Sequence, residues 1–288
     1  MKILITGAGG MLGSDLCSVL GDRAVPRTRA EMDVTVLRAC REAIREAGPS
    51  LVVHCGAFTD VDACETRPGM AFEVNALGTA NLALVCSLLE IPLLYVSTDY
   101  VFNGKKSAPY VESDPPHPLG AYGKSKWAGE DFIRKHLSRY CIVRTSWLFG
   151  RNGKNFVRSI LRQAREREHT GEPLRVVDDQ VGSPTYTLDL AGAILSLAKR
   201  QRVGTYHVTN QGTCSWYRFA CEILKDAGIS VPVVPIHSSD LGRPAPRPAN
   251  SVLDNRLWRA LGFLPLRPYR HALRAYLKEI CEKEASIV

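Results

Sequence analysis

The chain has 288 residues, of which 45% are hydrophobic and 23% charged, and its formal net charge is +8. It is long enough for one large domain or two joined ones, and it contains no internal repeat or low-complexity segment. No apolar run approaches the roughly 20 residues that span a bilayer, so we expect no membrane association and a cytoplasmic protein. The basic residues are dispersed rather than clustered. We therefore expect no nucleic-acid partner, and a surface with some attraction for anionic ligands.

The nine cysteines are odd in number and scattered, with no C-x-x-C pair. Several lie within apolar runs, as Cys17 does in DLCSVL and Cys86 in LALVCSLL. This pattern is typical of small buried side chains in a reducing compartment, and it predicts neither a disulfide framework nor a zinc site.

In the first half of the chain, short apolar runs alternate with longer amphipathic ones. The runs predict strands at 2–6, 23–26, 51–57, 91–98 and 140–149, separated by helices at 11–21, 35–47, 68–89 and 122–136. Apolar strands that alternate with helices indicate a parallel sheet covered on both faces. The predicted fold class is therefore α/β, with a doubly wound parallel sheet of the Rossmann type.

Beyond residue 150 the alternation weakens and prolines accumulate, as in GRPAPRPANS. A further strand and helix are predicted within 174–200. We expect a nucleotide-binding domain over 1–150 plus about 172–203, and a smaller, irregular substrate lobe over 151–171 plus 204–288. Open parallel sheets bind ligands at the carboxyl ends of their strands, so a lobe built there would close a cleft.

A glycine turn follows the first predicted strand. Gly7, Gly10 and Gly13 have the spacing G-x-x-G-x-x-G and open a helix through Met11 and Leu12. Such glycines permit a tight turn, close approach of the backbone to a pyrophosphate, and close packing of helix on strand, with the helix N-terminus facing the phosphates. A plain strand-to-helix turn would also use a glycine, but the position at the start of an alternating pattern favours a dinucleotide site.

No carboxylate occupies the position about 20 residues further on, where one would bind the adenosine ribose. That stretch contains Arg27 and Arg29 instead, which suit a 2′-phosphate and favour NADPH over NADH. The alternative is two surface arginines in a loop. Asp33 follows the second strand and either contacts the adenine or, with Thr35, helps to start the next helix.

Tyr122 and Lys126 form the one Y-x-x-x-K match in the sequence. Residues four apart share one face of a helix, so a lysine ammonium there would lower the tyrosine pKa from about 10 toward neutrality and allow it to transfer a proton. Thr98 ends the fourth predicted strand, where its hydroxyl would enter the same cleft. An aromatic anchor beside a solvated charge is the alternative for the pair alone.

The sequence resembles the extended short-chain dehydrogenases/reductases and, within them, the dTDP-4-dehydrorhamnose reductases. The resemblance lies in TGAGGMLG, VNALGTANLA, GAFTDVDACE, STDYVFNG, PYVESDPPHPLGAYGKSKWAGE, RTSWLFG, VVDDQVGSPT and RPANSVL, which extend over nearly the whole chain. It implies transfer of a hydride from NADPH to the C4 ketone of dTDP-6-deoxy-L-lyxo-4-hexulose. Tyr122 would protonate the product oxygen, Lys126 would hold the cofactor ribose, and Thr98 would bind the reacting oxygen.

The resemblance also assigns further contacts. Asp33 and Val34 would contact adenine, Ala57, Phe58 and Thr59 would line the cofactor groove, and Val96 would lie beside the nicotinamide. Asp99 and Trp147 would contact the sugar nucleotide, with Gln180 and Arg247 on the thymidine diphosphate. Without the resemblance, Trp147 would be taken as a core residue and Arg247 as part of an exposed loop. Asn75 would support the backbone of the active site.

The sequence departs from the family at the carboxylates that hold magnesium in some members. Asp15 follows the glycine turn, and Leu188 precedes Asp189 where a glutamate would be expected, so no metal is predicted. Two alternatives remain: an NADP-binding regulatory subunit similar to the methionine adenosyltransferase beta subunit, and another sugar-nucleotide reductase or epimerase. The oligomeric state is left open between monomer and homodimer, and NADH remains possible as the cofactor.

Overall fold

The computed structural model describes residues 2–168 and 170–285, so Met1, His169 and residues 286–288, which the two predicted halves include, lie outside it. Its centre is a six-stranded parallel sheet in the order β2-β1-β3-β4-β5-β10. The strands are β1 (Ile3–Thr6), β2 (Ala24–Arg27), β3 (Leu51–His54), β4 (Leu93–Thr98), β5 (Tyr140–Thr145) and β10 (Gly204–His207). The doubly wound, Rossmann-like fold class is confirmed.

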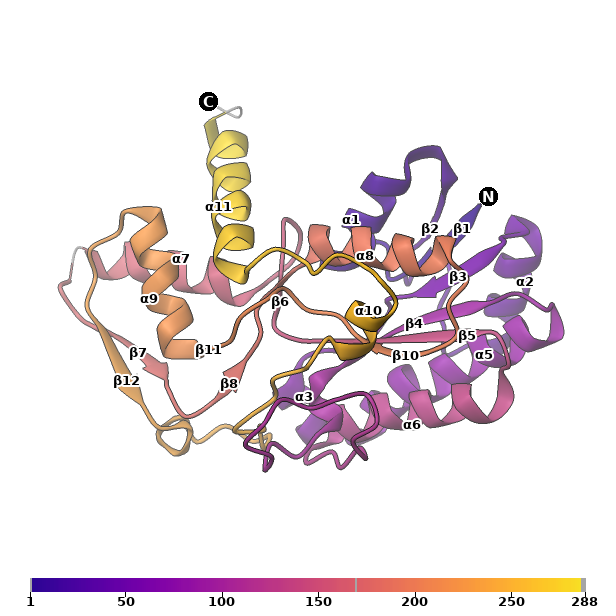
Figure 1. Cartoon of the computed structure of the whole chain (residues 1–288), viewed down its shortest axis with the longest axis horizontal. Helices are drawn as coiled ribbons and strands as arrows, with labels where there is room; N and C mark the ends of the chain where they lie inside the picture. The colour runs from indigo at the N-terminus through magenta and orange to yellow at the C-terminus, as the bar shows by residue number, and fades with distance from the viewer. Residues whose placement is uncertain (1, 169, 286–288) are drawn as a thin grey trace.

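Helices cover both faces of this sheet, as Figure 1 shows. One face carries α1 (Met11–Leu20) and α8 (Thr187–Lys199), and the other carries α2 (Leu37–Ala47), α5 (Gly78–Leu88) and α6 (Ala121–His136). Each helix turns an apolar stripe inward, as α1 does with Leu12, Leu16 and Leu20. Because both faces are covered, β1 and β3 are buried at every position, which explains their unbroken apolar sequences.

The helical stretch Pro68–Leu88 comprises α4 (Pro68–Phe72), a π-helical turn (Glu73–Leu77) and α5, and a short helix α3 (Val61–Thr66) precedes it. By length and composition alone it is the one described helix that passes the criterion for a membrane span, but half of its apolar window is buried inside the protein. Asn75, Thr79 and Asn81 are buried on it and hydrogen-bonded to neighbouring elements or to the helix itself. These contacts are those of a core helix.

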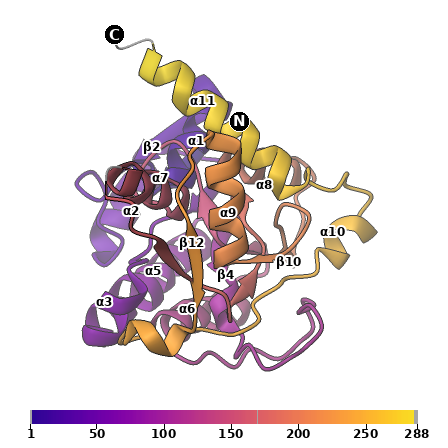
Figure 2. The same cartoon turned by 90° about the vertical axis from the view of Figure 1, so that its left-hand side faces the viewer.

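The second core lies in a lobe beyond the carboxyl edge of the sheet (Figures 1 and 2). Its main elements are α7 (Phe156–Glu168), β7 (Leu174–Val177), α9 (Trp216–Ala227), β12 (Val233–Ile236) and α11 (Tyr269–Ala285). The lobe is connected to the sheet through four short strands: β6 (Leu148–Phe149), β8 (Val181–Gly182), β9 (Thr185–Tyr186) and β11 (Cys214–Ser215). Helix α10 (Arg256–Ala260) packs against β10. Its core is rich in aromatic rings, including Phe149, Phe219 and Tyr276.

Two strands belong to the opposite half of the molecule from the one predicted for them. β7, which we assigned to the nucleotide-binding half, pairs with β12 in the lobe. β10, which we assigned to the lobe, pairs with β5 and completes the main sheet. The sequence GTYH of β10 is short and carries no apolar run, and its place is fixed by tertiary packing of Tyr206 and Val208 into the sheet core.

Candidate active site

A cavity of about 810 Å³ lies at the carboxyl edge of the sheet, between the glycine turn and the lobe. Its walls come from β4, α6 and the segments that follow β1 and β3 on one side, and from Trp147 and Trp216 on the other. The volume is within the usual range for small-molecule sites. In this strand order the direction of winding reverses between β1 and β3, which is where open α/β sheets bind ligands.

The glycine turn forms one end of the cavity, which Gly7, Gly10, Met11, Leu12 and Gly13 all line. Gly7 has a φ of 65°, and a Cβ there would lie 2.7 Å from the backbone nitrogen of Gly56. A Cβ on Gly13 would lie 2.2 Å from the carbonyl oxygen of Gly7. Both positions therefore require glycine, and α1 begins without a side-chain cap, which leaves its amide groups turned toward the cavity.

The two arginines after β2 have different places. Arg29 lines the cavity, with a largely exposed side chain whose Nε lies 3.4 Å from a carboxylate oxygen of Asp33. Arg27 does not line it and instead donates to the carbonyl of Pro26. Asp33 and Val34 line the cavity, and Asp33 also accepts hydrogen bonds from the amide and hydroxyl of Thr35, which chiefly lower its pKa.

The groove residues Ala57, Phe58, Thr59 and Val96 all line the cavity. Asn75 fixes this wall: its amide accepts from the Phe58 N–H at 2.8 Å and donates to the Phe58 carbonyl at 3.0 Å and to Ser125. Asn75 is fully buried on the π-helical turn, and this pairing supports the backbone beside the cavity.

Thr98, Tyr122 and Lys126 converge on the same cavity. The Thr98 hydroxyl donates to a carboxylate oxygen of Asp99 at 3.0 Å, and the Tyr122 ring meets Tyr100 edge-on at 5.6 Å between centroids. The Lys126 Nζ is almost fully buried, donates to the Val96 carbonyl at 2.8 Å and lies 4.1 Å from the centre of the Tyr95 ring.

The expected lowering of the Tyr122 pKa is not found. Burial raises the pKa of this phenol above its usual value, and hydrogen bonding with Thr98 opposes the rise only in part. Burial also lowers the pKa of Lys126 to about 7, against the attraction of Glu130. The predicted lowering requires a charged lysine beside the phenol, whereas burial disfavours the charged forms of both Lys126 and Tyr122.

The start of α6 is held so that Tyr122 enters the cavity on its first turn. Glu65 accepts the amide of Ala121 at 2.8 Å and so caps the helix from α3. A Cβ on Gly123 would lie 2.2 Å from the carbonyl oxygen of Tyr100, so glycine is required for α6 to pass this strand end closely. These contacts set the distance between the helix that carries Tyr122 and the loop that follows Thr98.

Asp99 lies beside this group, buried and lining the cavity. Burial raises the pKa of its carboxyl to about 6, while hydrogen bonds with Ser251 and Thr98 oppose the shift. A carboxyl group with such a pKa changes charge near neutral pH.

Trp147 lines the opposite wall in a backbone conformation that is rare for a large side chain, with a φ of 48°. This residue ends the predicted strand 140–149 early, separating β5 from β6. Its indole stacks on Trp216 with ring centroids 3.4 Å apart, and a Cβ on Gly182 would lie 2.3 Å from that indole. The ring is thus held between α9 and Gly182, and the backbone strain points to a functional position.

Two predicted contacts lie outside the cavity lining. Gln180 is buried next to β8. Arg247 donates to Asp62 at 2.8 Å and to the Ala245 carbonyl, so it ties the proline-rich segment to α3. Neither lines the cavity, and any contact with a nucleotide stays a prediction.

Several cavity residues were not predicted. They include Thr28, Cys55, Arg67, Met70, Tyr100, Lys154 and Trp216. Most come from loops or from the lobe, where no spacing rule links them to the glycine turn. Cys55 lies near the end of the predicted strand 51–57 and Tyr100 lies two residues after the predicted strand 91–98, and this closeness to a strand end is a signal that would have found them.

Comparison with known proteins identifies the family of this chain. Residues 1–282 match the RmlD substrate binding domain. The chain belongs to this family. It is 40% identical to dTDP-4-dehydrorhamnose reductase of Streptomyces griseus, over 96% of this chain and 93% of that protein. It is 42% identical to the spore coat polysaccharide biosynthesis protein SpsK of Bacillus subtilis, over 96% of this chain and 97% of that one. The crystal structure of Bacillus anthracis dTDP-4-dehydrorhamnose reductase in complex with NADP superposes with a TM-score of 0.93 at 38% identity, covering 97% of this chain and all of that one.

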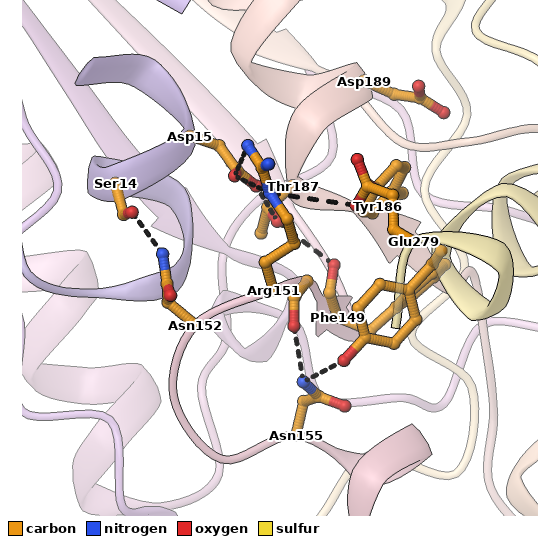
Figure 3. A network of polar contacts seen from close by, with 12 residues as sticks. Ser14, Asp15, Phe149, Arg151, Asn152, Asn155, Tyr186, Thr187, Asp189 and Glu279 are labelled. Atoms are coloured by element: carbon orange, nitrogen blue, oxygen red, sulfur yellow. Dashed lines mark hydrogen bonds and ion pairs between the residues drawn. The ribbon is translucent and has the colours of Figure 1, made fainter. Parts of the chain in front are cut away.

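This member of the RmlD family pairs the carboxylates at the departures noted above with arginines. Figure 3 shows the contacts of Asp15. Asp15 is fully buried and accepts from Arg151 at 3.3 Å and from the Thr187 hydroxyl at 2.5 Å. Asp189 accepts two hydrogen bonds from Arg267 at 2.8 Å. Among residues 2–168 and 170–285, no group of three His, Cys, Asp or Glu side chains is arranged to hold a metal ion.

Proposed function

We propose that this protein is an NADPH-dependent reductase of a dTDP-4-dehydro-6-deoxy sugar, converting dTDP-4-dehydro-L-rhamnose to dTDP-L-rhamnose. The observation that carries the proposal is the convergence of Thr98, Tyr122 and Lys126 on a cavity that begins at the glycine turn. Membership of the RmlD family and the similarity to reductases, one of them bound to NADP, support the choice of substrate and cofactor.

The residues of the cavity fit a nicotinamide dinucleotide. Gly7 and Gly13 let the turn fold tightly against Gly56 and against itself, and the start of α1 beside it has no side-chain cap, which suits a pyrophosphate. Arg29 has the charge for a 2′-phosphate and lies on the same wall as Asp33 and Val34. Lys126 would hold the nicotinamide ribose. When bound, NADPH supplies a hydride to the carbonyl carbon of the sugar.

The protein's own residues would then handle the proton. As the ketone carbon gains a hydride, its oxygen becomes an alkoxide and needs one proton to give the alcohol. Tyr122 would donate that proton, and the Thr98 hydroxyl would hydrogen-bond the oxygen. The burial that raises the Tyr122 pKa disfavours a free phenolate, so the group stays protonated until the reaction provides a stronger base.

The test is to follow oxidation of NADPH in the presence of dTDP-4-dehydro-L-rhamnose. We expect turnover by the wild type and a loss of at least about a hundredfold in Tyr122→Phe, the usual contribution of a general acid. No oxidation of NADPH by the wild type, or an unchanged rate in the variant, would refute the proposal. Binding of NADPH without turnover of any dTDP-sugar would favour a regulatory subunit, and tightly retained NAD would favour an epimerase.

The division into a nucleotide half and a substrate lobe fits this function, because each half would bind one of the two ligands. A cytoplasmic location and a monomeric or dimeric state stay predictions.

A further inference from the structure

Lys154 lies in the loop between β6 and α7. Four lysine and arginine side chains line the cavity: Arg29, Arg67, Lys126 and Lys154. Three of them have partners, since Arg29 pairs with Asp33, Arg67 lies 5.4 Å from the centre of the Phe58 ring, and Lys126 donates to the Val96 carbonyl. Lys154 is exposed and makes no ion pair or hydrogen bond with any residue that the structure describes.

The loop that carries Lys154 is fixed against the first turns of α1, as Figure 3 shows. Arg151 donates to the buried Asp15, and the Asn152 side chain donates to the Ser14 hydroxyl. Gly153 follows with a φ of 77°, close enough to Met11 that a Cβ on it would lie 3.4 Å from the Met11 Cγ. The loop therefore crosses α1 directly beside the glycine turn.

The other end of the loop is also anchored. Asn155 donates to the Gly150 carbonyl at 2.9 Å and to the Tyr276 hydroxyl, and its side-chain oxygen accepts the amide of Arg158 in the first turn of α7. Lys154 thus lies between two fixed points. Its backbone is ordered before a ligand arrives, and only the side chain needs to move.

We propose that Lys154 is a binding residue for the diphosphate of the dinucleotide cofactor. The uncapped start of α1 would offer backbone N–H groups to one side of the diphosphate, and Lys154 would add a positive charge from the facing loop. This inference rests on the proposed function. It assigns to the lobe-side loop a share of cofactor binding that the glycine turn would otherwise carry alone.

The experiment compares NADPH and NADH, which share the diphosphate and differ in the 2′-phosphate. Dissociation constants are measured by cofactor fluorescence for wild type, Lys154→Ala, Lys154→Glu and Arg29→Ala, at low and high salt. We expect Lys154→Ala to weaken both cofactors by the same factor, about tenfold at low salt and less at high salt, with a larger loss in Lys154→Glu. Arg29→Ala should weaken NADPH alone.

Lys124→Ala is the matched control, because Lys124 is an exposed lysine on α6 that does not line the cavity. It removes the same charge and should leave both affinities unchanged. Binding of dTDP, measured by calorimetry, should not change in Lys154→Ala.

Three results would overturn the inference while the wild type still binds cofactor. They are unchanged affinities in both Lys154 variants, a loss confined to NADPH, or a loss of dTDP affinity in place of cofactor affinity. Failure of the proposed function would look different, because the wild type itself would then fail to bind NADPH or to oxidise it.

Discussion

Lys126 shows how burial sets the charge of a single residue in this site. Its pKa is lowered to about 7 by desolvation, so at pH 8 most molecules of the free protein carry a neutral amine. An anionic cofactor near Nζ would favour the ammonium form and raise this pKa again. Binding is therefore expected to draw a proton from solution.

We predict that NADPH binding at pH 8 takes up close to one proton, and fewer as the pH falls below 7, where the lysine of the free protein is already charged. Calorimetry in buffers of different ionisation enthalpy measures this number. Lys126→Met should abolish the uptake, and Lys124→Met should retain it. Equal uptake in wild type and Lys126→Met would assign the proton to another group.

Gly182 determines the position of another single residue, Trp147. Because a Cβ at 182 would enter the indole of Trp147, we predict that Gly182→Ala displaces this ring from Trp216. Overpacking of this kind costs about 1–3 kcal/mol of unfolding free energy. The checks are denaturant unfolding and tryptophan fluorescence, which should change as the stacked pair separates.

Gly192→Ala is the control for this variant. Gly192 lies within α8 with open space where a Cβ would be placed, so alanine there should stabilise by up to about 1 kcal/mol and leave the fluorescence unchanged. A Gly182→Ala protein as stable as the wild type, with the same fluorescence, would show that the ring adapts without loss.

Buried polar contacts join the elements of the sheet half. Glu130 on α6 is fully buried, accepts from Ser97 on β4 at 2.5 Å, and forms hydrogen bonds of 2.8–3.2 Å with Arg144 on β5. Glu130 thereby joins β4, which carries Thr98, to α6, which carries Tyr122 and Lys126, and joins both to β5. The second guanidinium partner, Arg134, lies 2.6 Å from the same carboxylate.

We predict that Glu130→Gln lowers the unfolding free energy by about 3–5 kcal/mol, because it leaves Arg144 buried without its counter-charge. Denaturant unfolding measures the loss. Glu42→Gln removes one partner of an exposed ion pair on α2 and should change stability little. A similarly small effect at Glu130 would mean that water or another group compensates for the lost charge.

His54 on β3 forms hydrogen bonds with Thr6 on β1 and Thr79 on α5, and these bonds fix one neutral tautomer of its ring. The Thr79 hydroxyl donates to the Asn75 carbonyl, so it accepts from His54 Nε2, and Nδ1 then accepts from Thr6 at 2.7 Å. Burial lowers the pKa of His54 to about 3, and that of His207 likewise to about 3. The unfolded chain binds these protons near pH 6.5, before the folded protein does.

We therefore predict that stability falls as the pH drops from about 6.5 toward 3, by up to about 1.4 kcal/mol per pH unit for each of these histidines. Between these pH values the unfolded state holds the extra protons, so acid favours it. Unfolding measured across this range should show a shallower slope in His54→Asn. His136→Asn, at an exposed histidine on α6, should leave the slope as it is. An unchanged slope in His54→Asn would refute the argument.

At the scale of the whole molecule, the sequence predicted what local patterns specify. The alternating apolar runs located the parallel sheet, and the glycine turn, Thr98 and the Tyr122–Lys126 pair proved to share one cavity. It did not predict what depends on long-range packing: β10 as a strand of the main sheet, Trp216 against Trp147, or the position of Lys154. The Tyr122 pKa was misjudged for the same reason, since desolvation depends on every element around the site.

The path of the chain bears on how the molecule unfolds. After β5 the chain passes into the lobe through β6 and α7 and returns to the sheet half for α8 and β10. It enters the lobe again for α9 and β12, returns with α10, and ends in the lobe with α11. Arg151 on the lobe side holds Asp15 of α1, and Arg247 holds Asp62 of α3. Neither half is therefore a continuous segment that can unfold by itself.

We predict a single thermal transition by calorimetry, with the calorimetric and van't Hoff enthalpies in agreement. NADPH at about a hundred times its dissociation constant should raise the whole transition, adding about 2.7 kcal/mol to the unfolding free energy. Arg247→Ala should lower the midpoint and keep one transition, because the covalent crossings remain. Two resolved transitions, of which only one moves with NADPH, would instead show that the halves unfold separately and that the contacts of Asp15 and Asp62 do not couple them.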